Sequence, residues 1–112
     1  MTNAIIASAI AALIRIESAG DPGAVGDGGR AVGVLQMWPC AVQEANRLAG
    51  RRLWTLNDRR NPQLSRAMAW TILEHHYRRG NTDAVALACR WRNPYSACPE
   101  WYAAKVRRAL GR

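Results

Sequence analysis

The chain has 112 residues, enough for one domain with a single buried core. Hydrophobic residues make up 49% of it and charged residues 21%, which excludes the polar, highly charged composition of disordered chains. The net charge of +8 indicates an anionic partner, but phosphate backbones, anionic cell-wall polymers and outer-membrane or other acidic membrane surfaces all satisfy it. We therefore expect a single domain over residues 1–112.

The N-terminal stretch is apolar with helical spacing. Four residues repeat at that spacing: Ile5, Ala9, Leu13 and Ile16. They predict a largely buried helix over about residues 3–19 that ends near Gly20-Asp21-Pro22. The stretch lacks a positively charged flank and continues without a break into Arg15 and Glu17. We interpret it as the first helix of the fold and not as a secretory signal.

Glycine is concentrated after this helix. The segment from Arg15 to Met37 holds six of the nine glycines, which argues against a helix there and allows at most a short hairpin around residues 30–34. Glycine also leaves room for a ligand to approach the backbone. A phosphate-binding loop is the alternative, but no Lys-Ser or Lys-Thr follows and no strand leads into a G-x-G-x-x-G element.

Proline and glycine mark four further helices, over about 39–49, 62–79, 82–91 and 99–110, with a loop at 51–61. The expected first helical residues are Pro39, Pro62 and Pro99, and the expected N-caps are Asn61 and Thr82-Asp83. Gly50, Gly80 and Gly111 are expected just after helix ends. The predicted fold is mainly α, with a glycine-rich loop or short β-hairpin beside the first helix.

Glu17 is the most informative residue. A carboxylate on the inner side of an apolar helix is desolvated, which raises its pKa and keeps it protonated, as a general acid requires. The alternative is that Glu17 lies beside Arg15 on the exposed side of a fraying helix end. The following loop favours the first interpretation.

Three motifs occur in order: Glu17 to Pro22 (ESAGDP), Ala24 to Asp27 (AVGD), and Gly33 to Met37 (GVLQM), with Pro39 two residues later. This signature resembles the lysozyme-like enzymes that cleave peptidoglycan, in particular soluble lytic transglycosylases and goose-type lysozymes. Residues 61–65 and 86–106 resemble the later helices of that superfamily more weakly. Where transglycosylases usually have Tyr-Asn-Ala-Gly, this chain reads Arg90 to Pro94 (RWRNP).

The resemblance implies a lysozyme-like helical fold and makes Glu17 the catalytic acid at the bond between N-acetylmuramic acid and N-acetylglucosamine. Inverting hydrolysis needs a second carboxylate to activate water, whereas lytic transglycosylation uses the 6-hydroxyl of the sugar and one acid. Asp27 is the leading second carboxylate, and its alternative role is a turn residue. Asp21 and Asp58 are weaker candidates.

Residues expected to bind the substrate come mostly from the same motifs: Ser18, Gly33, Gln36, Met37, Trp38, Tyr77 and Trp91. Gln36 offers amide donors and an acceptor to a sugar, and the indoles of Trp38 and Trp91 can stack on sugar rings. Ser18 has no base beside it, so we expect it to shape the site or cap the helix. Trp70 and Trp101 are expected in the core.

No cofactor or metal is expected. Cys40, Cys89 and Cys98 lack C-x-x-C spacing, so we expect free thiols, with a Cys89–Cys98 bridge as the alternative in an oxidising compartment. His75 and His76 are adjacent and would not share a helix face, which disfavours a metal site or a nucleophile dyad.

The leading hypothesis is an enzyme acting on peptidoglycan glycan strands, as a phage endolysin or virion-associated lysin. We expect a monomer with no nucleic-acid partner, which reaches the wall by holin-type release or virion delivery. The alternative is a basic helical nucleic-acid-binding module. Its phosphate contacts would come from four arginine pairs, Arg51-Arg52, Arg59-Arg60, Arg78-Arg79 and Arg107-Arg108. A third possibility is a wall-binding protein that has lost the chemistry.

Overall fold

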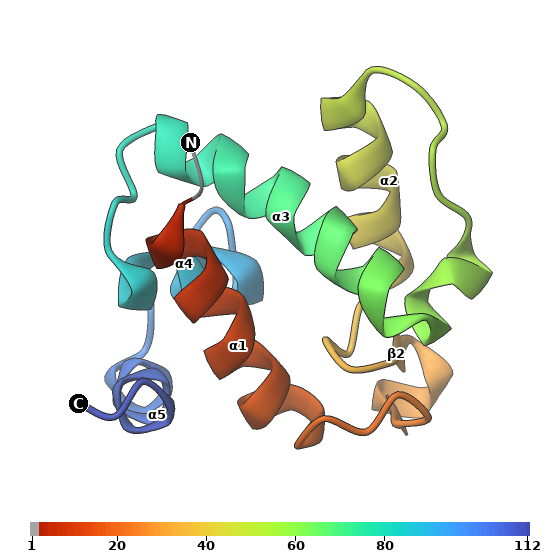
Figure 1. Cartoon of the computed structure of the whole chain (residues 1–112). Coiled ribbons are helices and arrows are strands. Elements are labelled where there is room, and N and C mark those ends of the chain that lie inside the picture. The colour runs from red at the N-terminus through yellow and green to blue at the C-terminus, as the bar shows by residue number, and fades with distance from the viewer. Residues whose placement is uncertain (1–2) are drawn as a thin grey trace.

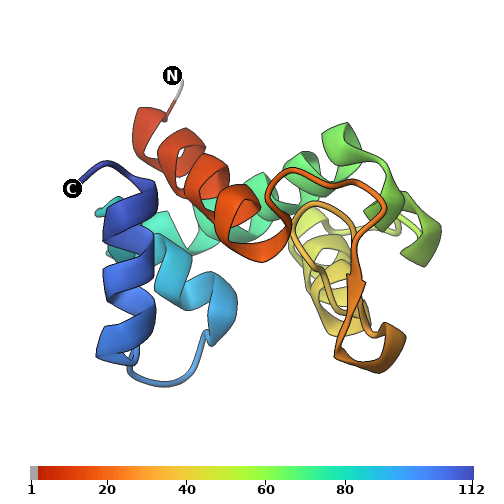
Figure 2. The same cartoon turned by 90° about the horizontal axis from the view of Figure 1, so that it is seen from below.

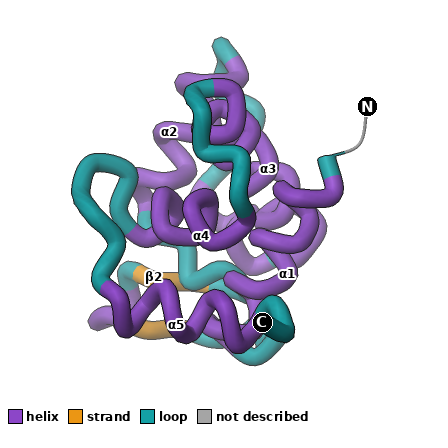
Figure 3. Tube along the Cα trace, turned by 90° about the vertical axis from the view of Figure 1, so that its left-hand side faces the viewer, coloured by secondary structure: helices purple, strands orange, loops and turns teal. Residues whose placement is uncertain are grey.

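The computed structural model describes residues 3–112 and is mainly helical, as the sequence predicts. In chain order the elements are α1 (Ala4–Ser18), β1 (Val25–Gly26), the 3₁₀ turn η1 (Asp27–Gly29), β2 (Ala31–Val32), α2 (Pro39–Ala49), the 3₁₀ helix η2 (Leu56–Arg60), α3 (Pro62–Arg78), α4 (Ala84–Arg92) and α5 (Glu100–Ala109). Most of the tube in Figure 3 is helix, and β1 and β2 are short pieces that lie close together. The predicted fold class is therefore confirmed.

The long helix α3 connects two groups of elements (Figure 1). Helix α1 packs against α3, α4 and α5, whereas α2 packs against α3 on the other side of the molecule. Seen from below, α4 and α5 lie on one side, α2 and the hairpin lie on the other, and the C-terminal end of α1 lies between them (Figure 2). One core cluster joins both groups, and its largest fully buried side chains are Ile6, Leu13, Leu35, Met37, Met68, Leu73, Leu87 and Val106.

Local capping determines where the helices begin. The side chain of Asn3 accepts hydrogen bonds from the amides of Ile5 and Ile6 and so starts α1. Asn61 caps α3 in the same way, with Pro62 in its first turn, as predicted. The cap of α4 is Asp83 and not Thr82, because the carboxylate of Asp83 accepts from the first amides of that helix.

Two other boundary predictions need correction. Pro99 is the residue before α5 and not its first helical residue. The loop predicted at 51–61 contains η2, in which the Asp58 carboxylate accepts a hydrogen bond of 2.9 Å from the Thr55 amide. This cap accounts for Asp58, so it has a structural role in that turn.

The hairpin begins earlier than the predicted segment at 30–34. Val25 pairs with Val32 and Gly26 with Ala31 in an antiparallel register, with η1 as the turn between them. A further bridge joins Val32 to Met37 and folds the next residues back onto the hairpin. The glycine-rich segment is thus an ordered double turn.

Arg59 holds this double turn against η2. The residue is only 9% exposed, and its guanidinium donates to the carbonyls of Arg30 and Met37, at 2.9 and 3.0 Å. The backbone of Arg59 also packs on Gly33, where a Cβ atom would lie 2.0 Å from the Arg59 carbonyl oxygen. Gly33 has φ of 85°, which glycine adopts at little cost. The site loop therefore depends on a glycine at 33 and an arginine at 59.

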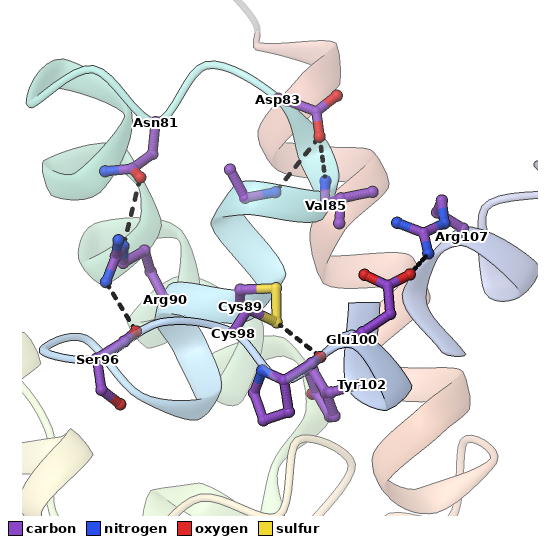
Figure 4. The surroundings of a disulfide bond; sticks show 12 residues. Asn81, Asp83, Val85, Cys89, Arg90, Ser96, Cys98, Glu100, Tyr102 and Arg107 are labelled. Atoms are coloured by element: carbon purple, nitrogen blue, oxygen red, sulfur yellow. Dashed lines mark hydrogen bonds and ion pairs between the residues drawn. A yellow bond between two sulfur atoms is a disulfide. The ribbon is translucent and has the colours of Figure 1, made fainter. Parts of the chain in front are cut away.

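The expectation of free thiols is wrong for two of the three cysteines. Cys89 near the end of α4 and Cys98 before α5 form a disulfide, with Cα atoms 5.4 Å apart (Figure 4). The bridge closes the segment 89–98. Cys40 is a free, exposed thiol.

No helix within residues 3–112 is long and apolar enough to cross a membrane.

We predict that Gly33→Ala lowers the free energy of unfolding by at least about 3 kcal/mol, because the added methyl group meets the Arg59 backbone at a left-handed position. Gly28→Ala is the matched control. Gly28 also has positive φ, at 66°, but open space around it, so only the backbone term of about 1 kcal/mol is expected. Urea unfolding of both variants measures the difference, and equal losses would contradict the close approach to Arg59.

Candidate active site

Glu17 lies in the last turn of α1, half-buried, where the helix meets the loop after the hairpin. The neighbouring Ser18 hydroxyl lies 2.7 Å from the Val34 carbonyl oxygen and 3.2 Å from that of Ile14. It also accepts a hydrogen bond from the Gly20 amide. Ser18 thus ties the end of α1 to the loop, which agrees with the predicted site-shaping role.

Tyr102 on α5 is the direct partner of Glu17. The residue is 4% exposed, and its hydroxyl donates a hydrogen bond of 3.2 Å to Glu17 Oε2. The sequence predicted a different tyrosine, Tyr77, as a residue of the site. Tyr77 is half-buried against the core and does not line the large cavity described below. The two partners are 85 residues apart in the chain, so only the packing of α5 on α1 reveals the contact.

Trp101 is not a core residue, contrary to prediction. It is 57% exposed because its neighbour Tyr102 occupies the inner face of α5, and adjacent helical residues do not share a face. The guanidinium of Arg92 lies 4.8 Å from the Trp101 ring centroid and 5.1 Å from that of Tyr102. Arg92 thereby brings a positive charge to the ring whose hydroxyl contacts Glu17. Trp70, the other expected core tryptophan, is partly buried against the core.

Burial dominates the electrostatics of Glu17 and raises its pKa above the ordinary value. The hydrogen bond from Tyr102 and the charges of Arg92 and Lys105 oppose this by stabilising the carboxylate, while the negative charge of Asp27 adds a smaller upward effect. The pKa of Tyr102 is also raised, by burial and by the nearby carboxylate. Tyr102 therefore stays a neutral hydrogen-bond donor, and Glu17 retains its proton to a higher pH than an exposed glutamate.

Asp27 lies in the hairpin turn with φ of 51°, an unusual value for a residue other than glycine. Its side chain does not cap its own turn; it accepts a hydrogen bond of 3.2 Å from the Trp38 indole N–H. The Arg30 guanidinium lies 5.5 Å from the centroid of the same indole. Asp27 is exposed and close enough to influence Glu17, so the structure brings both candidate acids to one region.

Gln36 and Gly33 build the loop from within. The Gln36 side-chain amide donates to the carbonyls of Ala24 and Gly33, both at 3.0 Å, so its donors already have partners. Its side-chain oxygen lies 2.7 Å from where a Cβ atom of Gly26 would be. Gly33 is buried against Arg59. Both residues hold the loop in place, and Gln36 also lines the cavity described below, so its predicted contact with the substrate stays a prediction.

A cavity of about 910 Å³ lies between α2, the C-terminal half of α3, α4 and the segment after it. It brings together four predicted binding residues, Gln36, Met37, Trp38 and Trp91. Glu17, Ser18 and Asp27 are not wall residues of the cavity. Arg92 links the two parts, since it lines the cavity and also acts on Glu17. The acid thus lies beside the cavity.

Within residues 3–112, no group of three His, Cys, Asp or Glu side chains is placed to hold a metal ion. His75 and His76 both line the cavity and stack edge to face, with ring centroids 5.3 Å apart.

The sequence model of the Transglycosylase SLT domain matches residues 2–98. Neither a curated protein nor a solved structure matches the chain significantly. The matched segment includes Glu17, the hairpin, the loop to Met37 and both cysteines of the Cys89–Cys98 disulfide. It ends before Tyr102. Because the match covers most of the chain, the protein belongs to the Transglycosylase SLT domain family, whose members are glycosidase-type enzymes that act on peptidoglycan.

Proposed function

We propose that the chain cleaves the β-1,4 bond between N-acetylmuramic acid and N-acetylglucosamine, with Glu17 as the general acid. The observation that supports this most strongly is the half-buried Glu17 carboxyl, whose pKa is raised by desolvation and which receives a hydrogen bond from Tyr102. A carboxyl in such surroundings holds its proton to a higher pH than an exposed glutamate does, and it can release that proton to a glycosidic oxygen. The position of Glu17 in the matched family segment adds to this support.

In the proposed mechanism Glu17 donates its proton to the glycosidic oxygen as the bond from that oxygen to C1 of the muramic acid breaks. Positive charge develops at C1, and the 6-hydroxyl of the same sugar attacks it to close a 1,6-anhydro ring. The Glu17 carboxylate then takes the proton of that hydroxyl, which restores the acid. Between the two transfers the carboxylate is stabilised by the Tyr102 hydroxyl and the charges of Arg92 and Lys105.

Hydrolysis is the alternative outcome, with Asp27 activating a water. We favour transglycosylation because the Asp27 carboxylate already accepts a hydrogen bond from the Trp38 indole, and because one acid with a stabilised conjugate base is sufficient for this reaction.

We further propose that the protein acts as a monomeric phage endolysin or virion-associated lysin, reaching the wall by holin-type release or virion delivery. Its charge of +8 would attract it to anionic wall polymers.

Digestion of purified peptidoglycan tests the assignment of Glu17. Glu17→Gln keeps the shape of the side chain but cannot donate the proton, so we expect the rate of soluble-fragment release to fall at least about 100-fold. Glu74→Gln, which removes an exposed carboxylate on α3, is the control with expected wild-type activity. Mass spectrometry of the fragments reads the reaction type: 1,6-anhydro ends support transglycosylation, and reducing ends would replace it with hydrolysis. Equal activity of wild type and Glu17→Gln would refute the general-acid role.

The pH dependence tests Tyr102 as a positioning residue. Its hydrogen bond lowers the pKa of Glu17, so Tyr102→Phe should raise that pKa further and move the basic limb of the kcat/KM profile to higher pH. A purely structural role would lower thermal stability without moving the limb. A pH series of initial rates for the two proteins distinguishes these results.

Desolvation of Glu17 also predicts a pH-dependent gain in stability from Glu17→Gln. The pKa of Glu17 in the fold lies above its unfolded value, so its contribution is fully present at low pH and is lost as pH rises through the folded pKa. Glutamine does not ionise. The melting temperature of Glu17→Gln relative to wild type should therefore rise between about pH 4 and pH 7. A difference that shrinks over this range would mean that the fold favours the carboxylate.

A further inference from the structure

The cavity beside the active site is strongly cationic. Its wall contains four arginines, two histidines and a single carboxylate: Arg47, Arg79, Arg90, Arg92, His75, His76 and Glu44. Glu44 is already paired, because Arg47 donates to both of its oxygens at 2.8 and 2.7 Å. The remaining arginines therefore leave the cavity with excess positive charge.

Arg90 is positioned without being neutralised. Its guanidinium donates to Asn81 Oδ1 at 3.4 Å and to the carbonyl of Ser96 at 3.2 Å (Figure 4). It also donates to the carbonyl of Pro94 at 3.3 Å. These acceptors are uncharged, and the disulfide next to Arg90 closes the segment that supplies two of them. Across residues 3–112, no carboxylate lies within ion-pair distance of Arg90 or Arg79.

His76 responds to the same positive field. Burial lowers the pKa of His76, and the charges of His75, Arg90 and Arg79 lower it further. The ionised form of Glu44, in turn, is favoured chiefly by its hydrogen bond from Arg47 and to a lesser degree by both histidines. This part of the cavity therefore favours an added negative charge and disfavours an added positive one.

Aromatic side chains stand among these cations. Trp38 is 39% exposed and Tyr95 is 92% exposed, and both line the cavity together with the half-buried Trp91. Exposed aromatic faces beside guanidinium groups suit a ligand that combines amide or alkyl groups with carboxylates. A peptide with several carboxylates has this chemistry, whereas inorganic phosphate lacks the apolar part.

We propose that this cavity is a subsite for the stem peptide of peptidoglycan, in which Arg79 and Arg90 bind its carboxylates. The inference rests on the proposed function, because the stem peptide is attached to the muramic acid whose bond is cut. Arg92 and Trp38 line the cavity, and they also act on Glu17 and Asp27 respectively, so the cationic wall begins next to the two carboxylates. A volume of about 910 Å³ is in the range of sites for small ligands and fits a few peptide residues.

The test compares two substrates: glycan strands that carry stem peptides, and the same strands after an amidase has removed them. Arg79→Gln should lower the ratio of kcat/KM on stem-bearing to stem-free strands about five- to tenfold, the effect of one charge-assisted hydrogen bond at a partly exposed site. Arg78→Gln is the matched control. It removes the same charge from the next residue, which pairs with Glu74 at 3.6 Å and lies outside the cavity. Its ratio should remain that of wild type.

If Arg79→Gln and Arg78→Gln have the same ratio of kcat/KM on stem-bearing to stem-free strands, the proposed peptide subsite is refuted. Absence of wild-type activity on both substrates would overturn the proposed function instead, so binding is measured separately. Free stem tetrapeptide should bind the inactive Glu17→Gln protein and should bind the Glu17→Gln/Arg79→Gln protein about five- to tenfold more weakly. Binding of inorganic phosphate without binding of the tetrapeptide would identify a site for wall phosphates and refute the peptide subsite.

Discussion

The buried guanidinium of Arg59 is the interaction on which the site loop depends. It reaches from η2 to the carbonyl of Arg30, just after the first turn, and to that of Met37, just after the second. Its own carbonyl packs on Gly33 and accepts from the buried Ser65 hydroxyl. Removing the guanidinium would lose both hydrogen bonds at a position where Arg59 is only 9% exposed. The hairpin itself has only two short strands and could not hold this shape alone.

The fixed loop in turn places the acid. Ser18 joins the end of α1 to Val34, and Tyr102 reaches Glu17 from α5, so the carboxyl is held from two sides. Burial raises its pKa, while Tyr102, Arg92 and Lys105 moderate the rise. The balance matters chemically, because an acid must hold its proton before the transfer and be stable without it afterwards. A desolvated carboxylate also lowers stability at neutral pH.

The parts of the structure that local chemistry determines could be predicted from the sequence. Helices α1, α2 and α3 were placed to within a residue or two because Asn61, Pro62, Gly50 and similar residues mark their ends. Glu17 was found because its helix and loop are contiguous in the sequence. Contacts between distant segments were not predictable: Tyr102 in place of Tyr77, the Cys89–Cys98 bridge, and the inward amide of Gln36 each depend on how helices or turns meet in space.

Adjacent arginines show most clearly why composition alone could not assign function. In the Arg59-Arg60 pair, Arg59 is buried as a structural hub and Arg60 is exposed. In the pair at the end of α3, Arg78 binds Glu74 whereas Arg79 lines the cavity. Consecutive residues point in different directions, so a pair that looks like one basic patch in the sequence supplies two unrelated roles. The charge of +8 is therefore not a uniform attraction to polyanions: part of it holds the loop, part stabilises the conjugate base of Glu17, and part faces the cavity where we place the peptide of the substrate.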